Sequence, residues 1–392
     1  MPDKSPARPE ALRPGLLVCL SYYHPNVSGL TISAAEQAEA FVRRGHAAAV
    51  VSARQKGTAA REVINGVRVF RSWMPWRIGK APVMPLYPFT IWRALDGIAM
   101  VGIHMPCPEA GMAALIARLR GRRVIISYVT SISTADRASR IIRALSAMSH
   151  LVAGVLADRI QVVSKDYADN SNFCRLFRRK LRYAVIPTPF PPEDQLFQAL
   201  KRPKGDGPLH IGYVGRLARQ KSLGVLLDAF DGLPDRIGRE VILHLCGPAA
   251  DIIGETDWQK TLQAANASNG RIRYHGVLHG AALQAFYGGL DLMVLPSTDR
   301  QESFGLVQVE AMLQGVPVVA SDLAGMREPV RQTGMGLLSV PGDANDLRAC
   351  IAKVLTEGPP QRADLARLHA LFGTETSCAP YFELADKISR QP

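Results

Sequence analysis

Two glutamates, Glu302 and Glu310, stand eight residues apart, shortly after an apolar run that ends at Leu295. If a helix begins near Ser303, its first amide groups face the preceding loop, and Glu310 lies roughly 12 Å from Glu302 at 1.5 Å per residue. A carboxylate at each end of a diphosphate can accept hydrogen bonds from sugar hydroxyls, whereas a carboxylate beside the phosphates would repel them. The spacing therefore suits a sugar and a ribose joined by a diphosphate. For an arbitrary pair of this spacing, a helix-start acid and a solvated glutamate are the commoner explanation.

A second candidate site follows Val214, where Gly215, Arg216 and Lys221 precede an amphipathic helical pattern. Glycine allows close approach of the backbone to a ligand, and cations beside a helix start suit a diphosphate. Two exposed bases in an ordinary loop would have the same sequence, so this segment alone leaves both interpretations open. The chain has no GxGxxG or Walker spacing.

Both segments follow short apolar runs that alternate with helical patterns. The chain has 392 residues, enough for two globular domains. The predicted strands are 16–22, 47–51, 101–104 and 124–128 in the first half, and 209–214, 241–246, 271–274, 292–295, 316–320 and 337–340 in the second. The alternation predicts an α/β fold of two Rossmann-like, doubly wound parallel-sheet domains that face a central cleft, with ligands at the carboxyl ends of the strands.

The domain boundaries follow from composition. Residues 1–14 are expected to be a disordered lead-in, and 15–190 the first domain. The proline-rich segment 191–207 is expected to be the linker, and 208–375 the second domain.

Charge is divided unevenly along the chain. The net charge is +13, and residues 1–200 contain 27 bases and 13 acids, whereas residues 201–392 contain 20 and 21. The first half is therefore expected to meet an anionic membrane surface, a phosphorylated acceptor or nucleic acid, unless the bases form only a solvated face.

The six cysteines occur singly without a CxxC pair, which argues against a disulfide framework and a zinc site. No apolar run approaches the roughly 18 to 20 residues of a membrane span. We expect a cytoplasmic protein whose contact with a membrane is peripheral.

In combination these segments resemble the retaining glycosyltransferases of family four, which have the GT-B fold. The matching pieces occur in the family's order along nearly the whole chain; they are Ser28 with Gly29, Gly215 to Lys221, Glu302 to Glu310, and Ser321 to Glu328. The second half matches strongly and the first half more loosely. The resemblance also implies that a helix at 376–392 packs back on the first domain.

The resemblance implies a role for each matching position. Arg216 and Lys221 would neutralise the leaving nucleotide diphosphate, Glu302 would touch the donor sugar, and Glu310 would bind the ribose. Backbone groups at Gly29, Gly215 and the run Ser303, Phe304 and Gly305 would complete the donor site. A departing phosphate oxygen would help to deprotonate the acceptor. The chain has no DxD motif, so no metal and no cofactor besides the nucleotide sugar is expected.

One departure from the family stands out. Relatives often have a histidine directly after the strand predicted at 124–128, where this chain has Val129, Thr130 and Ser131. His104 also matches a family position, although a lone histidine after a strand is more often structural. The second glycine usual in the 325–328 stretch is replaced by Met326.

Three segments of the first half bear on the acceptor. Residues 71–93 mix aromatics with bases and suit either a lipid headgroup interface or a packed loop. Residues 141–156 form an apolar helical pattern, for which a buried helix is favoured over a membrane-facing one. Five bases between Arg175 and Arg182 could hold a diphosphate or an anionic lipid surface, and no nucleic-acid recognition motif accompanies them.

Together these features predict a transferase that moves a hexose to a glycan or polyprenyl-diphosphate-linked acceptor at the inner face of the plasma membrane, in bacterial surface polysaccharide or glycolipid synthesis. Mannose from GDP-mannose is the favoured donor, with UDP-linked hexoses as the alternative. Because of the missing histidine, a catalytically weak relative that serves as a membrane-associated scaffold is the rival interpretation.

Overall fold

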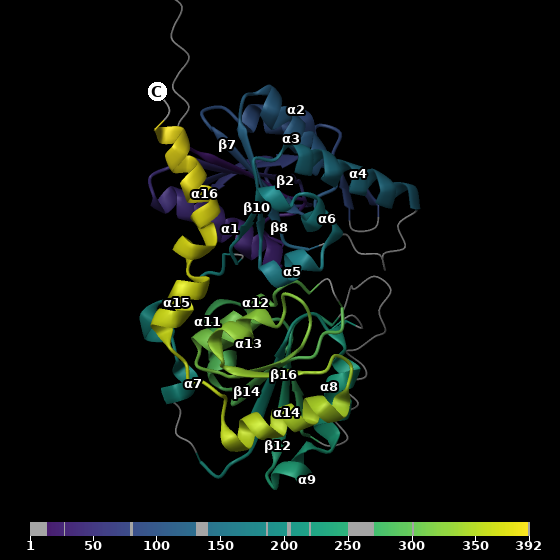
Figure 1. The fold of residues 1–392 in the computed structure, drawn as a ribbon, viewed down its shortest axis with the longest axis vertical. Coiled ribbons are helices and arrows are strands. Elements are labelled where there is room, and N and C mark those ends of the chain that lie inside the picture. Colours follow the sequence, from purple (N-terminus) through teal and green to yellow (C-terminus); the bar gives the residue numbers. More distant parts are fainter. Residues whose placement is uncertain are drawn as a thin grey trace, which may run out of the picture. The chain divides into compact units, whose positions relative to one another are not determined.

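A computed structural model describes residues 14–390 except 27, 79–80, 131–139, 186, 202–204, 219–220, 250–269 and 300–301. The expected lead-in, 1–14, thus lies almost wholly outside the described residues. By internal contacts the chain forms two compact units, residues 1–189 with 372–392 and residues 190–371, which we call the first and the second domain. Figure 1 shows the course of the chain through both.

The first domain is built on an eight-stranded sheet of order β10-β9-β8-β7-β1-β2-β4-β3. All neighbouring strands are parallel except the outermost pair, β3 and β4. Its strands are β1 (Leu16–Cys19), β2 (Ala48–Ala53), β3 (Arg61–Ile64), β4 (Val67–Ser72), β7 (Met100–Met105), β8 (Arg123–Tyr128), β9 (Arg159–Val162) and β10 (Leu181–Tyr183). A separate hairpin joins β5 (Trp76–Ile78) to β6 (Ala81–Val83).

Helices connect these strands, as the alternating pattern predicts. They are α1 (Gly29–Arg43), α2 (Tyr87–Ala94), α3 (Ala110–Leu119), α4 (Arg140–Leu156), α5 (Lys165–Asp169), α6 (Asn172–Leu176), the 3-10 turn η1 (Arg178–Lys180) and α16 (Thr374–Ser389). The start of α1 is fixed by a capping box, in which the Thr31 amide donates to Ser28 Oγ and the Ser28 amide donates to Thr31 Oγ1.

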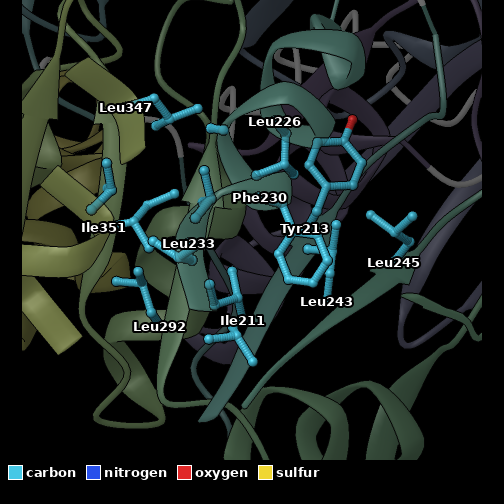
Figure 2. Packing of buried hydrophobic residues seen from close by; sticks show 14 of the residues in the cluster. Ile211, Tyr213, Leu226, Phe230, Leu233, Leu243, Leu245, Leu292, Leu347 and Ile351 are labelled. Atoms are coloured by element: carbon cyan, nitrogen blue, oxygen red, sulfur yellow. The ribbon is translucent and has the colours of Figure 1, made fainter. Parts of the chain in front are cut away.

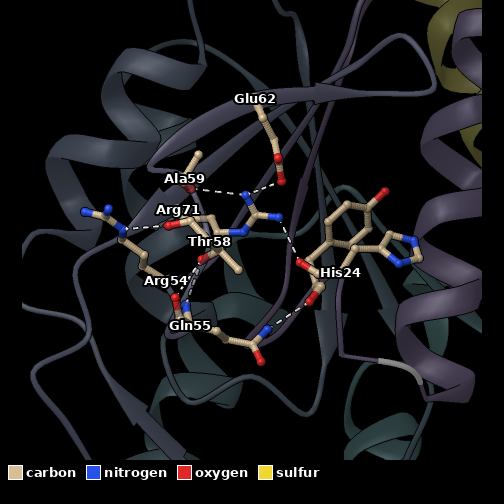
Figure 3. A network of polar contacts seen from close by, with 8 residues as sticks. His24, Arg54, Gln55, Thr58, Ala59, Glu62 and Arg71 are labelled. Atoms are coloured by element: carbon tan, nitrogen blue, oxygen red, sulfur yellow. Dashed lines mark hydrogen bonds and ion pairs between the residues drawn. The ribbon is translucent and has the colours of Figure 1, made fainter.

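A buried arginine holds the loop between β1 and α1 in place. Arg71 of β4 donates to the carbonyls of His24 (2.8 Å) and Ala59 (3.1 Å) and pairs with Glu62 of β3 (Figure 3). Gln55 adds a hydrogen bond to the Tyr23 carbonyl at 3.0 Å. These contacts offset part of the cost of burying the guanidinium, and they tie the loop ahead of Gly29 to the outer strands.

The C-terminal helix α16 completes the first domain. The Tyr381 hydroxyl lies 2.8 Å from Ser127 Oγ of β8, and its ring packs so closely on Gly102 of β7 that a Cβ there would lie 2.9 Å from Tyr381 Cε1. Arg159 donates to the Pro380 carbonyl (2.8 Å) and pairs with Glu383 (2.9 Å). The segment expected at 376–392 thus begins at Thr374 as a helix and packs on the first sheet.

The second domain contains a six-stranded, wholly parallel sheet of order β13-β12-β11-β14-β15-β16. Its strands are β11 (Leu209–Val214), β12 (Val241–Cys246), β13 (Ile272–Tyr274), β14 (Leu292–Leu295), β15 (Val318–Ser321) and β16 (Gly336–Ser339). Its helices are η2 (Glu193–Gln195), α7 (Gln198–Lys201), α8 (Leu223–Asp231), α9 (Leu233–Ile237), α11 (Gly280–Gly288), α12 (Leu306–Leu313), α13 (Glu328–Thr333), α14 (Ala344–Glu357) and α15 (Leu365–Phe372).

One face of this sheet carries a continuous apolar core. Ile211 and Tyr213 of β11 and Leu243 and Leu245 of β12 pack with side chains of α8, α9 and α14 (Figure 2). Phe230 of α8 is among them. The sequences of these strands are mostly apolar because, in a parallel sheet, both faces are covered by other parts of the chain.

Residues 191–207, expected as the linker, lie within the second domain instead. The Phe197 amide donates to the Leu313 carbonyl (2.9 Å) and the Ala199 amide to the Gln314 carbonyl (3.1 Å). These bonds fix α7 beside the end of α12. The proline-rich segment is therefore the start of the second domain and not a linker between the two domains.

Replacing Tyr381 tests the role of α16. Tyr381→Ala is expected to destabilise the first domain by about 3 to 5 kcal/mol, because it empties a fully buried aromatic site. Tyr381→Phe should cost only about 1 kcal/mol, through the hydrogen bond to Ser127. Tryptophan fluorescence during denaturant unfolding reports this domain, which contains Trp73, Trp76 and Trp92. An alanine variant within 1 kcal/mol of wild type would contradict this role of α16.

Replacing Gly247, just after β12, tests a close backbone approach. Its φ is +134°, and a Cβ there would lie 2.0 Å from the Gly215 carbonyl oxygen. Gly247→Ala should therefore cost about 2 to 4 kcal/mol. Gly224→Ala in α8 is the control, since nothing lies within 4 Å of its Cβ, and it should be neutral or stabilise by up to about 1 kcal/mol. Thermal unfolding can be followed by circular dichroism, and equal unfolding midpoints for the two variants would contradict the prediction.

Candidate functional site

The strand order of the second sheet brings the two candidate segments together. From β11 the chain moves one way, through β12 and β13, and then returns to β14 on the other side of β11 before continuing outward. The loops that follow β11 and β14 therefore start side by side at the carboxyl edge, at the position where such sheets bind ligands. One loop contains Gly215 to Lys221 and the other contains Glu302 to Gly305.

Direct contacts join these two loops. The Lys221 ammonium group forms an ion pair with the Glu302 carboxylate. Ser222 Oγ lies 2.6 Å from Thr298 Oγ1 and accepts a hydrogen bond from the Thr298 amide at 3.2 Å. The sequence singled out both ion-pair partners, but it did not indicate that they touch.

Lys221 is the most perturbed cation of the site. Its side chain is 19% exposed. Burial and, to a smaller extent, the nearby positive charge of Arg216 lower its pKa to about 8, and Asp299 opposes the shift. The Arg216 side chain is exposed. An anion that approached both groups would meet the Arg216 guanidinium and the Lys221 amine, and its negative charge would favour the protonated form of that amine.

The backbone of the first loop is shaped by its neighbours. The Gly215 amide donates to the Cys246 carbonyl, and Gly247 lies against Gly215, as described above. The buried Tyr213 hydroxyl donates to the Arg216 carbonyl at 2.8 Å. Tyr213 was not among the residues singled out from the sequence. Its position near the end of the strand that precedes Gly215 could have identified it.

The helix after Glu302 begins later than expected. Helix α12 starts at Leu306 with Gly305 as its N-cap at φ +73°, not near Ser303, so the estimate of roughly 12 Å between Glu302 and Glu310 rested on helical turns that do not form. Gly305 allows this turn, since a Cβ there would lie 2.6 Å from Leu295 Cδ2. Ser303 and Phe304 are both buried residues.

Gln308 anchors the start of α12. Its amide group donates to the carbonyls of Phe304 and Met326, both at 2.8 Å. Met326, where the family resemblance led us to expect a glycine, is fully buried. The stretch Ser321 to Glu328 is thus joined to the site through Gln308.

Glu310 lies on α12 and is oriented by a residue that the sequence analysis missed. The fully buried Tyr287 of α11 donates a 2.7 Å hydrogen bond to Glu310 Oε2. Burial raises the pKa of Glu310, and this hydrogen bond partly offsets the effect. No sequence pattern connects the two residues, which lie 23 positions apart.

In the first domain, Gly29 is the first residue of α1, behind the Ser28 cap. His104 is fully buried in β7, where its Nε2 lies 2.7 Å from Gln37 Oε1 and burial lowers its pKa to about 4. Its burial and its contact with Gln37 favour a structural role for His104. Glu109, in the loop after β7, was not singled out; burial raises its pKa to about 7.

The acceptor-side segments are mostly exposed. Of the aromatics in residues 71–93, Tyr87 is buried, whereas Trp73, Trp76, Phe89 and Trp92 are between 47% and 67% exposed. In the described part of the chain, no helix is both long and apolar enough to cross a membrane, and no cluster of three potential metal ligands occurs.

Comparison with known proteins identifies both halves. The model described as Glycosyl transferase 4-like domain matches residues 28–189, and Glycosyl transferases group 1 matches residues 194–367. A 2-deoxystreptamine glucosyltransferase of Streptomyces kanamyceticus is 31% identical over 166 residues, 42% of this chain and 40% of that protein. A glycogen synthase of Mycobacterium tuberculosis is 32% identical over 204 residues, 50% of this chain and 47% of that protein. The chain thus spans less than half the length of these curated relatives.

Solved structures agree over almost the whole chain. Sucrose-phosphate synthase from Thermosynechococcus elongatus matches with a TM-score of 0.72 at 19% identity, covering 96% of this chain and 99% of that one. Anabaena HepE in complex with UDP-glucose matches with a TM-score of 0.69 at 19% identity, covering 95% and 99%. The two family models and this shared two-domain architecture lead to one conclusion: the chain belongs to the glycosyltransferases of the group 1, family-four type, with the GT-B fold.

Proposed function

We propose that this chain is a retaining, metal-independent hexosyltransferase that uses a nucleotide sugar as donor. The observation that carries the proposal is the meeting of Arg216, Lys221 and Glu302 at the carboxyl edge of the second sheet, where β11 and β14 are adjacent. Two cations there match the charge of a leaving diphosphate, which other enzymes neutralise with a divalent ion.

The Lys221–Glu302 ion pair suggests how donor binding and catalysis are linked. A donor phosphate competes for the Lys221 ammonium group, and Glu302 is then released to accept hydrogen bonds from sugar hydroxyls. As the bond between the sugar and the phosphate breaks, Arg216 and Lys221 stabilise the growing charge on the diphosphate. The departing phosphate oxygen takes the acceptor proton, so the account requires no dedicated base.

The remaining residues position the nucleotide. Glu310, held by Tyr287, would accept hydrogen bonds from the ribose hydroxyls. The backbone of Gly215 and of residues 303–305 would lie against the diphosphate, since helix α12 directs its first amide groups toward the loop. Gly29 would have the equivalent position in the first domain.

For the donor we propose mannose from GDP-mannose, as the family resemblance implies, against a UDP-linked hexose. The UDP-glucose complex of HepE and the glucosyltransferase relative support the UDP alternative. For the acceptor we propose a glycan or a polyprenyl-diphosphate-linked sugar at the cytoplasmic face of the plasma membrane, in line with the basic first half. The rival function is a weakly active scaffold, which the intact Arg216, Lys221 and Glu302 argue against.

Thermal unfolding with GDP, UDP, ADP and their sugar conjugates tests the donor site. A ligand at about 100 times its dissociation constant adds roughly 2.7 kcal/mol, which raises the midpoint by several degrees. One base should stabilise wild type, and the effect should be lost in Arg216→Ala and reduced in Glu310→Ala. Arg331→Ala on α13 is the control and should keep the full shift. Absence of a shift with every nucleotide would favour the scaffold.

Nucleotide affinity should also depend on pH through Lys221. A diphosphate binds the protonated amine, so affinity should fall as the pH rises above 8, by up to about tenfold per pH unit. Lys221→Arg should remove this fall, because guanidinium stays charged. Without nucleotide, the free energy of unfolding should depend on pH in the opposite direction. Between pH 8 and 10.5 the unfolded chain keeps the Lys221 proton and the folded chain loses it, so the stability of the fold rises with pH in this range. Calorimetric titrations giving the same pH profile for both proteins would contradict the assignment.

A further inference from the structure

Helices α2, α3 and α4 of the first domain lie side by side. Helix α2 packs on α3, and α3 packs closely along α4 (Figure 1). The packing of α3 on α4 uses small residues, since a Cβ on Gly111 would lie 2.7 Å from the Ser149 carbonyl oxygen. Ala113, Ala114 and Ala153 are also buried. With small residues turned inward, the large apolar side chains of these helices are left outside.

Each of the three helices exposes a stripe of large apolar side chains. On α4 the stripe runs at helical spacing through Leu145, Met148, Val152 and Val155, with Leu151 beside it, and these side chains are 41% to 65% exposed. The equivalent stripes are Met112, Leu115 and Leu119 on α3, and Leu86, Phe89 and Trp92 at and within α2. The expectation that 141–156 is a buried helix was therefore wrong for this side of α4. We call these eleven residues the apolar helical face.

The three helices of this face bring bases but no acids, and the acids that follow them, Asp96 and Asp158, pair with Arg120 and Arg118. The sequences of α2, α3 and α4 contain no aspartate or glutamate. Lys180 donates to the carbonyls of Gly154 and Val155, which places η1, with its exposed Arg178 and Arg179, at the end of α4. At the other side, the Arg120 guanidinium lies 4.5 Å from the centre of the Trp92 ring.

We propose that the apolar helical face docks on an anionic lipid bilayer, with its aliphatic and aromatic side chains among the acyl chains and Arg178 and Arg179 at the headgroups. Apolar side chains bordered by arginines are typical of segments that lie in the membrane interface. An anionic bilayer offers charge complementary to the exposed Arg178 and Arg179, whereas a second copy of the chain, with a net charge of +13, would offer mostly like charge. The inference rests on the proposed function, since it names the surface through which the chain would meet a lipid-linked acceptor.

Vesicle flotation tests this surface directly. Wild type should bind phosphatidylcholine vesicles that contain phosphatidylglycerol, bind vesicles of phosphatidylcholine alone much more weakly, and lose binding as salt is raised. Met148→Glu combined with Val152→Glu should reduce binding at least about tenfold, because two charges would enter the apolar layer. Val63→Glu is the matched control: it replaces an apolar side chain of the first domain that is 68% exposed but lies on β3, outside the face. It should bind like wild type.

The charged border has its own test. Arg178→Glu should weaken binding to anionic vesicles severalfold, whereas Arg236→Glu, on an exposed position of α9 in the second domain, should not. Equal effects of the test and control substitutions, or no vesicle binding by wild type, would overturn the inference. So would a wild-type dimer that the double glutamate variant converts to monomer, since a second copy would then cover the face.

The same variants separate this inference from the proposed function. Nucleotide-dependent thermal shifts should remain at the wild-type value in the Met148 and Val152 double variant, which also verifies its folding. Vesicle binding without any thermal shift by nucleotides would support the docking face and contradict the proposed transferase function. A thermal shift by a nucleotide without vesicle binding would support the transferase function and contradict the docking face.

Discussion

The ion pair between Lys221 and Glu302 is the contact on which the site depends. Its partners are 81 residues apart, and their side chains are 19% and 18% exposed. Burial favours the neutral amine and lowers the pKa of Lys221 to about 8, so the lysine is still mostly protonated near pH 7 and can pair with the carboxylate. The contact forms because the strand order places β11 beside β14, so that two loops far apart in sequence emerge at one edge of the sheet. The pair thus joins the two loops directly.

Uncharged contacts give that pair its geometry. Gly215 and Gly247 meet so closely that only glycine fits at position 247, and the Tyr213 hydroxyl fixes the Arg216 carbonyl. On the other side, Gln308 ties the start of α12 to the loop around Met326, and Tyr287 orients Glu310. These hydrogen bonds are buried or partly buried, and such bonds hold groups in position more rigidly than exposed ion pairs can.

Much of the fold could be predicted from the sequence, because apolar strand runs and amphipathic helices leave a periodic signal. Strands 209–214, 241–246 and 292–295 coincide with β11, β12 and β14. The start of α12 was missed by three residues, since the left-handed turn at Gly305 depends on packing against Leu295. The Tyr287–Glu310 bond and the exposed stripe of α4 could not be predicted either. Both depend on which helices pack together, and a sequence pattern does not distinguish a buried apolar stripe from an exposed one.

The most direct measurement compares the affinities of a nucleoside diphosphate and its monophosphate, using the base that stabilises the chain most. Titration calorimetry near pH 7, where Lys221 is protonated, isolates the contribution of the second phosphate. Wild type should bind the diphosphate at least about tenfold more tightly, and Arg216→Ala combined with Lys221→Ala should remove most of this preference while monophosphate affinity changes little. Equal preference in wild type and the double variant would contradict the assignment of these two cations to the diphosphate.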